Sequence, residues 1–147
     1  MHGLGNDFVV IDAVSQTVDL SPDVCKRLAD RRLGIGCDQI LVVDPASHAE
    51  VDFAYRIFNA DGSQVGQCGN GARCFARFVQ REGLSDKTSI KVATATTQMQ
   101  LDLLPADWVR VHLQVPDFNP AKIPLLQDVE QAEYELPIAG AVVRGGA

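Results

Sequence analysis

The chain has 147 residues, enough for one domain with a real hydrophobic core but too few for two full-sized domains. Hydrophobic residues make up 46% and charged residues 22%, and the net charge is −6 with the basic residues scattered along the chain. This pattern argues against a nucleic-acid surface or an anionic membrane partner, and no apolar run approaches membrane-spanning length. Because the N-terminus lacks the features of a signal peptide, we expect a cytoplasmic protein whose four cysteines are free thiols.

The first part of the chain alternates strand and helix signals. An apolar run at 8–11 predicts a buried strand. Residues 21–23, Ser-Pro-Asp, predict a helix start with a capping hydroxyl, a proline in the first turn and an acid, and Gly34 can end that helix. Two further strands are predicted at 40–43 and 51–58, the second with alternating apolar and polar side chains.

A second helix is predicted from about Asn70 to Glu82, ending at Gly83. Its buried face is marked by apolar residues at the helical spacing, namely Ala72, Phe75, Ala76 and Val79. Cys68 therefore lies at or just before a helix N-terminus, where free backbone N–H groups and the helix dipole favour a thiolate. A thiolate is a nucleophile, a base or a metal ligand.

The last part of the chain first gives strand signals and then becomes irregular. Strands are predicted at 89–93, 99–104 and 109–115, the last two joined as a hairpin. Further on, the chain is interrupted by Pro116, Pro120, Pro124 and Pro137. Residues 138–143 resemble a strand that has just begun. Two helices among many short strands predict an α+β domain with the helices packed on a largely antiparallel sheet.

The other three cysteines are best explained by packing. Cysteine is among the most often buried residue types, and Cys25 lies on the inner face of the first predicted helix. Packing is also the favoured role of Cys37, which follows a Gly-Ile-Gly segment. Cys74 lies six residues beyond Cys68. In a helix this spacing turns the side chain by roughly 120° and raises it about 9 Å, so the two thiols do not flank one carbon atom.

Other kinds of site are disfavoured by spacing. The two helix cysteines do not have a zinc-knuckle spacing, and no histidine forms a local pair with them. Neither Gly34-Ile35-Gly36 nor Gly69-Asn70-Gly71 completes a dinucleotide-binding fingerprint, and no P-loop sequence occurs. A cysteine–histidine pair of Cys68 with His2 stays open at this point.

Three short polar motifs are predicted at junctions between loops and strands. They are Gly5-Asn6-Asp7, Asp38-Gln39 and Asn59-Ala60-Asp61-Gly62-Ser63. Their amides and carboxylates suit the binding of a small zwitterion, because they offer both donors and acceptors. Taken singly, each is better explained as ordinary turn chemistry, because Asn, Asp and Gly dominate turns.

Taken together and in order, these motifs resemble the diaminopimelate epimerase family. The resemblance rests on four blocks, which are Met1–Phe8, Arg32–Gln39, Phe58–Ser63 and Cys68–Cys74. It is close over residues 1–83 and thins through about residue 125. It implies a first lobe, residues 1–115, with a mixed or antiparallel sheet curled around a central helix, and an incomplete start of a second lobe at 116–147.

The resemblance also implies an activity: cofactor-independent interconversion of LL- and meso-2,6-diaminopimelate in lysine and peptidoglycan-precursor synthesis. In that family one cysteine from each lobe faces the α-carbon of the substrate, and Cys68 matches the first of them. The positions that match substrate-binding residues are Asn6, Gln39, Asn59, Gly69 and Asn70. No metal is implied, and a homodimer is a further expectation.

The second catalytic-cysteine block of the family has no match in this sequence. We therefore expect the 147-residue chain alone to be inactive or nearly so, as a first lobe that is shortened or divergent at its end. Two alternatives stay open. One is a related isomerase of the same fold, of the proline-racemase or phenazine-pathway kind, and the other is a non-catalytic amino-acid-binding module.

Overall fold

The computed structural model describes residues 1–115, 117–119, 122, 129 and 131–146. The chain divides into two compact units, Met1–Leu113 and Gln114–Ala147. Among the described residues no helix has the length and apolar character needed to cross a membrane.

The first unit is built from one mixed sheet of eight strands and two helices. In chain order its elements are β1 (His2–Gly3), β2 (Asn6–Asp12), α1 (Pro22–Ala29), β3 (Gln39–Pro45), β4 (Phe53–Asn59), β5 (Gln64–Val65), α2 (Gly69–Arg81), β6 (Ser89–Ala93), β7 (Gln98–Leu103) and β8 (Val109–His112). The expected α+β class and the predicted hairpin of β7 and β8 are confirmed.

The strands follow the order β1-β2-β3-β4-β6-β7-β8, with β5 paired to β4 outside this path. Two neighbouring pairs are parallel, β2 with β3 and β4 with β6, and the others are antiparallel. One edge of β4 is shared, because β5 pairs with Ile57 and Phe58 while β6 pairs with Phe53 and Ala54.

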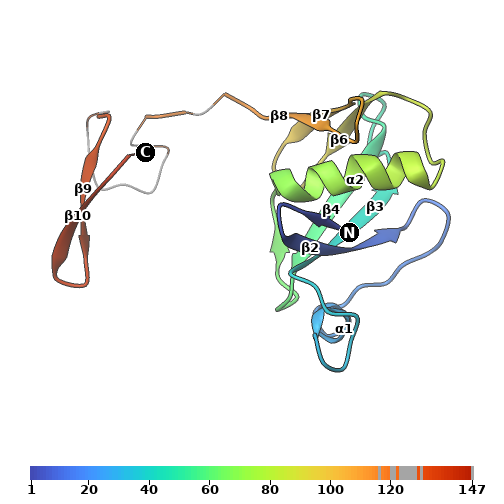
Figure 1. Cartoon of the computed structure of the whole chain (residues 1–147), viewed down its shortest axis with the longest axis horizontal. Coiled ribbons are helices and arrows are strands. Elements are labelled where there is room, and N and C mark those ends of the chain that lie inside the picture. The colour runs from blue at the N-terminus through green and yellow to red at the C-terminus, as the bar shows by residue number, and fades with distance from the viewer. Residues whose placement is uncertain (116, 120–121, 123–128, 130, 147) are drawn as a thin grey trace. The chain divides into compact units, whose positions relative to one another are not determined.

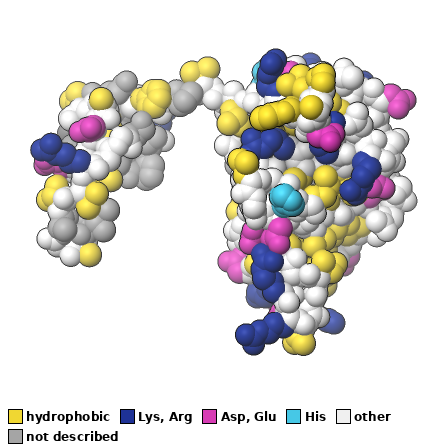
Figure 2. Space-filling view, viewed as in Figure 1, with side chains coloured by type: hydrophobic (Ala, Val, Ile, Leu, Met, Phe, Trp, Pro, Cys, Tyr) yellow, Lys and Arg dark blue, Asp and Glu magenta, His cyan; other side chains and the backbone are white. Residues whose placement is uncertain are grey.

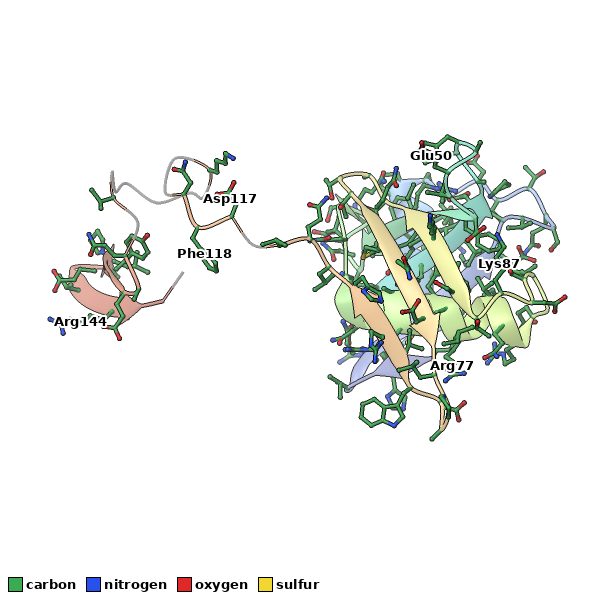
Figure 3. The ribbon with its side chains drawn as sticks, turned by 90° about the horizontal axis from the view of Figure 1, so that it is seen from above. Glu50, Arg77, Lys87, Asp117, Phe118 and Arg144 are labelled. Atoms are coloured by element: carbon green, nitrogen blue, oxygen red, sulfur yellow. The ribbon has the colours of Figure 1, made fainter. Side chains whose placement is uncertain are left out.

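Helix α2 lies against one face of this sheet, which curls around it (Figure 1). It contacts β1 and β2 near one end of the strand order and β7 and β8 at the other end. The apolar face predicted for it is fully buried, and the Phe75 ring packs 4.9 Å from the ring of Tyr55 between centroids. Near its C-terminal end, Arg77 donates to the carbonyl oxygens of Leu104 and Trp108 at 2.8 and 2.9 Å, which fixes the turn between β7 and β8 (Figure 3). The expected sheet curled around a central helix is confirmed.

Helix α1 packs on the opposite face of the sheet, where Cys25 is buried with Ile40 and Val42. It ends at Ala29 rather than at Gly34, because Asp30 has an extended backbone with φ −60° and ψ 120°. The Asp30 carboxylate accepts the backbone N–H groups of Arg32 and Leu33 and so stabilises a turn in place of a further helical turn.

The second unit contains an antiparallel pair, β9 (Tyr134–Ile138) and β10 (Ala141–Gly145). The prediction of one strand at 138–143 is wrong, because Ala139 and Gly140 form a turn with φ 49° and 84°. Two consecutive positive φ values are typical of a tight hairpin turn. The predicted interruptions at Pro116, Pro120 and Pro124 lie outside the described residues.

Candidate active site

Cys68 is the N-cap residue of α2, as the sequence predicts. Its backbone is extended, with φ −150° and ψ 115°, and its carbonyl oxygen accepts the N–H of Ala72 at 2.9 Å. Its Sγ accepts the N–H of Gly71 at 3.4 Å. The thiol therefore takes the place that a serine or aspartate oxygen usually occupies at a helix start.

Three strand ends bring amide side chains to the same end of the sheet. β2 and β3 are parallel and begin at Asn6 and Gln39, whereas β4 is antiparallel to β3 and ends at Asn59. Gln39 pairs in register with Phe8 on one side and with Asn59 on the other. Since side chains alternate along strands, Asn6, Gln39 and Asn59 share the sheet face on which Phe8 packs against α2.

Hydrogen bonds set the orientation of these amides. Asn6 Nδ2 lies 4.0 Å from Cys68 Sγ and donates to it, and Gln39 Nε2 donates to Asn59 Oδ1 at 2.9 Å. Asn59 Nδ2 in turn donates to Ser63 Oγ at 3.1 Å, and Ser63 is held by the Asp61 carboxylate. Gln39 Oε1 is buried and has no hydrogen-bond partner among the described residues.

The first turn of α2 completes the site. In a helix that begins at Gly69, the N–H groups of Gly69 and Asn70 have no carbonyl partner within the helix. A Cβ added to Gly69 would meet open space, with no atom within 4 Å. The Asn70 side chain accepts a hydrogen bond from Arg73. We call the six residues that the sequence predicts, Asn6, Gln39, Asn59, Cys68, Gly69 and Asn70, the thiol–amide cluster.

Tyr55, on β4, contacts the start of α2. It is not among the site residues that the sequence predicts. It is fully buried, and its hydroxyl donates to the carbonyl oxygen of Cys68 at 3.4 Å. Burial, followed by the nearby Cys68 and Cys74, raises the pKa of Tyr55 far above its usual value, so the hydroxyl stays a donor. A Cβ on Gly71 would collide with this hydroxyl, which explains a glycine inside the first turn. The alternating pattern of 51–58 places Tyr55 in the core but gives no sign of this contact.

Cys25, Cys37 and Cys74 are buried, which confirms that they pack in the core, and Cys68 alone of the four thiols is half-buried. Burial raises the pKa of each of those three thiols and holds them neutral. The hydrogen bonds given to Cys68 Sγ come from Gly71 and Asn6, and none among the described residues joins it to His2. No three His, Cys, Asp or Glu side chains gather as a metal site within the described part of the chain.

Two carboxylates of the polar motifs, those of Asp7 and Asp38, do not join the cluster. Asp7 and Asp38 alternate with Asn6 and Gln39 along their strands, so they lie on the opposite face of the sheet. There both bind the guanidinium of Arg31, a residue that the sequence patterns did not single out. The polar motifs are expected from the sequence to bind a small zwitterion through both amides and carboxylates. In the structure the amides lie on the same face of the sheet as Cys68, whereas the carboxylates of Asp7 and Asp38 do not.

Solved structures share this fold. A phenazine biosynthesis protein of the PhzF family from Bacillus anthracis is 19% identical with a TM-score of 0.53, and the match covers 76% of this chain and 35% of that one. A methylitaconate-delta-isomerase is 12% identical with a TM-score of 0.55, and the match covers 93% of this chain and 77% of that one. At these identities the likeness establishes the fold alone.

The curled sheet around a helix is the fold of these two solved structures, and in this chain Cys68 lies at the start of that helix. The family model for diaminopimelate epimerase matches residues 1–117. The chain belongs to the diaminopimelate epimerase family.

Proposed function

We propose that Cys68 is one of two acid–base groups that interconvert LL- and meso-2,6-diaminopimelate at the α-carbon, without pyridoxal phosphate or another cofactor. The observation that carries this proposal is the position of Cys68 at the start of α2, with three amide side chains on the adjoining face of the sheet. Membership of the diaminopimelate epimerase family supports the choice of substrate.

The first turn of α2 suits the reacting carboxylate. When the Cys68 thiolate removes the α-proton, it becomes a thiol and the electron pair spreads from the carbon onto the α-carboxylate. The free N–H groups of Gly69 and Asn70, together with the helix dipole, stabilise that growing negative charge. An acid on the opposite side then returns a proton to the other face of the carbon, so the overall proton count does not change.

The amides of the cluster suit the remaining polar groups of the substrate. Gln39 Oε1 is a buried acceptor for which the described residues supply no donor, and a protein group in this state is costly unless a ligand supplies the bond. Diaminopimelate carries two ammonium groups, which are donors only. We assign Asn6, Gln39 and Asn59 to binding the substrate and Cys68 to proton transfer.

The second acid–base group is proposed to come from outside the described residues. The other three thiols are buried and held neutral, so none can exchange protons at the cluster. We therefore propose that the 147-residue chain alone is inactive or nearly so in converting LL- to meso-diaminopimelate.

The biological setting follows from the same family membership and is part of the proposal. We place the reaction in the cytoplasm, in the synthesis of lysine and of the peptidoglycan precursor. Figure 2 shows basic and acidic side chains interspersed on the visible face of the first unit, which supports a small-molecule substrate over a nucleic-acid or membrane partner. A homodimer stays a prediction.

Incubation of the chain with LL-diaminopimelate in D2O tests the chemical role of Cys68. We expect slow deuterium entry at the α-carbon with retained configuration, because a single base returns the deuteron to the face it came from. Cys68→Ser should abolish it, whereas Cys74→Ala, which removes a buried thiol from the same helix, should retain it. Formation of meso-diaminopimelate at enzymatic rates by this chain would contradict the assignment of the second group.

A non-catalytic amino-acid-binding module is the second candidate, favoured by the presence of one half-buried thiol among four. It predicts binding of diaminopimelate with no deuterium entry in either the parent chain or Cys68→Ser. A related isomerase of the same fold predicts exchange into a different substrate, which a panel of amino and hydroxy acids in D2O would reveal.

A further inference from the structure

Three charged side chains join the starts of β2 and β3 on the sheet face opposite the thiol–amide cluster. Arg31 binds Asp7 through both terminal nitrogens, at 2.9 and 2.7 Å, and also donates to Asp38 Oδ1 at 2.8 Å. We call these three residues the ion-pair cluster.

The two carboxylates of the ion-pair cluster also bind each other's backbone. The N–H of Asp7 donates to Asp38 Oδ2 at 3.0 Å, and the N–H of Asp38 donates to Asp7 Oδ1 at 2.8 Å. The same N–H of Asp38 lies 3.1 Å from the carbonyl oxygen of Asp7. These reciprocal bonds fix the backbone of one strand start against the other, in the register that pairs Phe8 with Gln39.

Each carboxylate is next in sequence to an amide of the thiol–amide cluster. Asn6 precedes Asp7 and Gln39 follows Asp38, and the alternation of side chains sends the amides to the α2 face and the carboxylates to the α1 face. Arg31 therefore does not reach a substrate bound beside Cys68. Any effect it has on that site passes through the backbone of β2 and β3.

We propose that Arg31, with Asp7 and Asp38, positions Asn6 and Gln39 relative to Cys68. Without the guanidinium, two carboxylates would face each other across the strand starts and separate them. The Arg31 hydrogen bonds outweigh desolvation and hold the pKa of Asp7 well below its usual range, which keeps it ionised. Because Arg31 and Asp38 are solvent-exposed and Asp7 is only half-buried, we expect the ion-pair cluster to act on local geometry far more than on overall stability.

The test has two readouts, an NMR signal and the binding of diaminopimelate. Only the binding measurement rests on the proposed function. By NMR, the contact of Asn6 with Cys68 predicts a nuclear Overhauser effect between the Asn6 side-chain amide and the Cys68 β-protons. We expect Arg31→Ala to abolish this signal. It should also weaken diaminopimelate binding about tenfold, the effect of one lost hydrogen bond to a charged group. The midpoint of thermal unfolding should be nearly unchanged.

Two further variants separate positioning from general effects. Arg32→Ala removes a neighbouring arginine for which no side-chain bond is found among the described residues, and it should leave both readouts unchanged. Arg31→Ala/Asp38→Asn removes the repulsion and lets the new amide donate to Asp7, so it should restore the signal and most of the binding. Retention of the Asn6–Cys68 signal in Arg31→Ala would overturn the inference, as would equal losses in Arg32→Ala. Absence of binding by the unaltered chain would instead overturn the proposed function and leave the NMR test decisive.

Discussion

Gln39 donates a hydrogen bond to Asn59 Oδ1 at 2.9 Å, and its own Oε1 is buried with no hydrogen-bond partner in the described part of the chain. The donor end of the amide is thus used inside the protein, while the acceptor end is left unpaired among the described residues. An unsatisfied acceptor of this kind lowers stability, and a binding site is where such a cost is expected.

Replacement of Gln39 separates binding from stability. Gln39→Met removes the unsatisfied oxygen but also the donor to Asn59 Oδ1, and it keeps the length of the side chain. Because the first change stabilises and the second destabilises, we expect the free energy of unfolding to change by less than about 1 kcal/mol. Binding of diaminopimelate should weaken about tenfold or more, because a hydrogen bond from an ammonium group is lost. Urea unfolding and ligand titration measure the two effects. Unchanged binding would show that Gln39 has no role in the site.

Gly71 and Tyr55 are predicted to be coupled. Gly71→Ala drives a methyl group into the Tyr55 hydroxyl and towards Leu41, which we expect to cost about 1–3 kcal/mol of unfolding free energy. Tyr55→Phe removes the hydroxyl, so the cost of Gly71→Ala should fall in the double variant. Gly69→Ala is the control, because its methyl group meets open space. Additive effects in urea unfolding would contradict the contact.

The cysteines are predicted to differ sharply in reactivity. At neutral pH in the folded protein, iodoacetamide should modify Cys68 first, because the other three thiols are buried and burial raises the pKa of each. In denaturant all four should react at similar rates. Mass spectrometry of peptides after timed quenching gives the individual rates, and fast labelling of Cys25 or Cys74 in the folded protein would contradict the structure.

Asp102 makes the unfolding free energy of the first unit depend on pH in the acid range. Hydrogen bonds from Gln100, His112 and Ser89 lower the pKa of Asp102 from 3.8 to about 2. Its contribution is therefore present above pH 4 and is lost as the pH falls from about 4 towards 2. Asp102→Asn should flatten the fall of unfolding free energy in this window. Asp86→Asn, at a carboxylate with no ion pair among the described residues, should leave the slope unchanged.

The parts of the fold that the sequence predicts are those with long periodic patterns. The sequence predicts helix α2 because four apolar residues recur at helical spacing, and it predicts the start because glycines and an asparagine precede that pattern. The sequence does not predict β1 and β5, because two residues are too few for any period. β9 was missed because Pro137 indicated a break, although a proline is tolerated in a two-stranded edge pair.

The site residues were found as motifs, but their arrangement was not. No pattern in the sequence indicates that β2 and β3 are parallel, and this pairing places Asn6 and Gln39 at one end of the sheet. The role of Arg31 was missed for the same reason, since it depends on bringing Asp7 and Asp38 together across strands that are far apart in sequence. Local sequence patterns predict the helices and strands. Pairing between strands that are far apart in the sequence determines which polar side chains lie on the same face of the sheet.

The central claim is that diaminopimelate binds beside Cys68, and protection of this thiol from alkylation tests it most directly. The rate of iodoacetamide labelling of the chain is measured with and without LL-diaminopimelate. Two matched ligands serve as controls: L-lysine, which lacks one carboxylate, and pimelate, which lacks both ammonium groups. We predict that diaminopimelate slows labelling of Cys68, with a dissociation constant on the order of millimolar for so few hydrogen bonds, and that the other two ligands have little effect. Equal labelling rates with and without diaminopimelate, or equal protection by all three ligands, would contradict the claim.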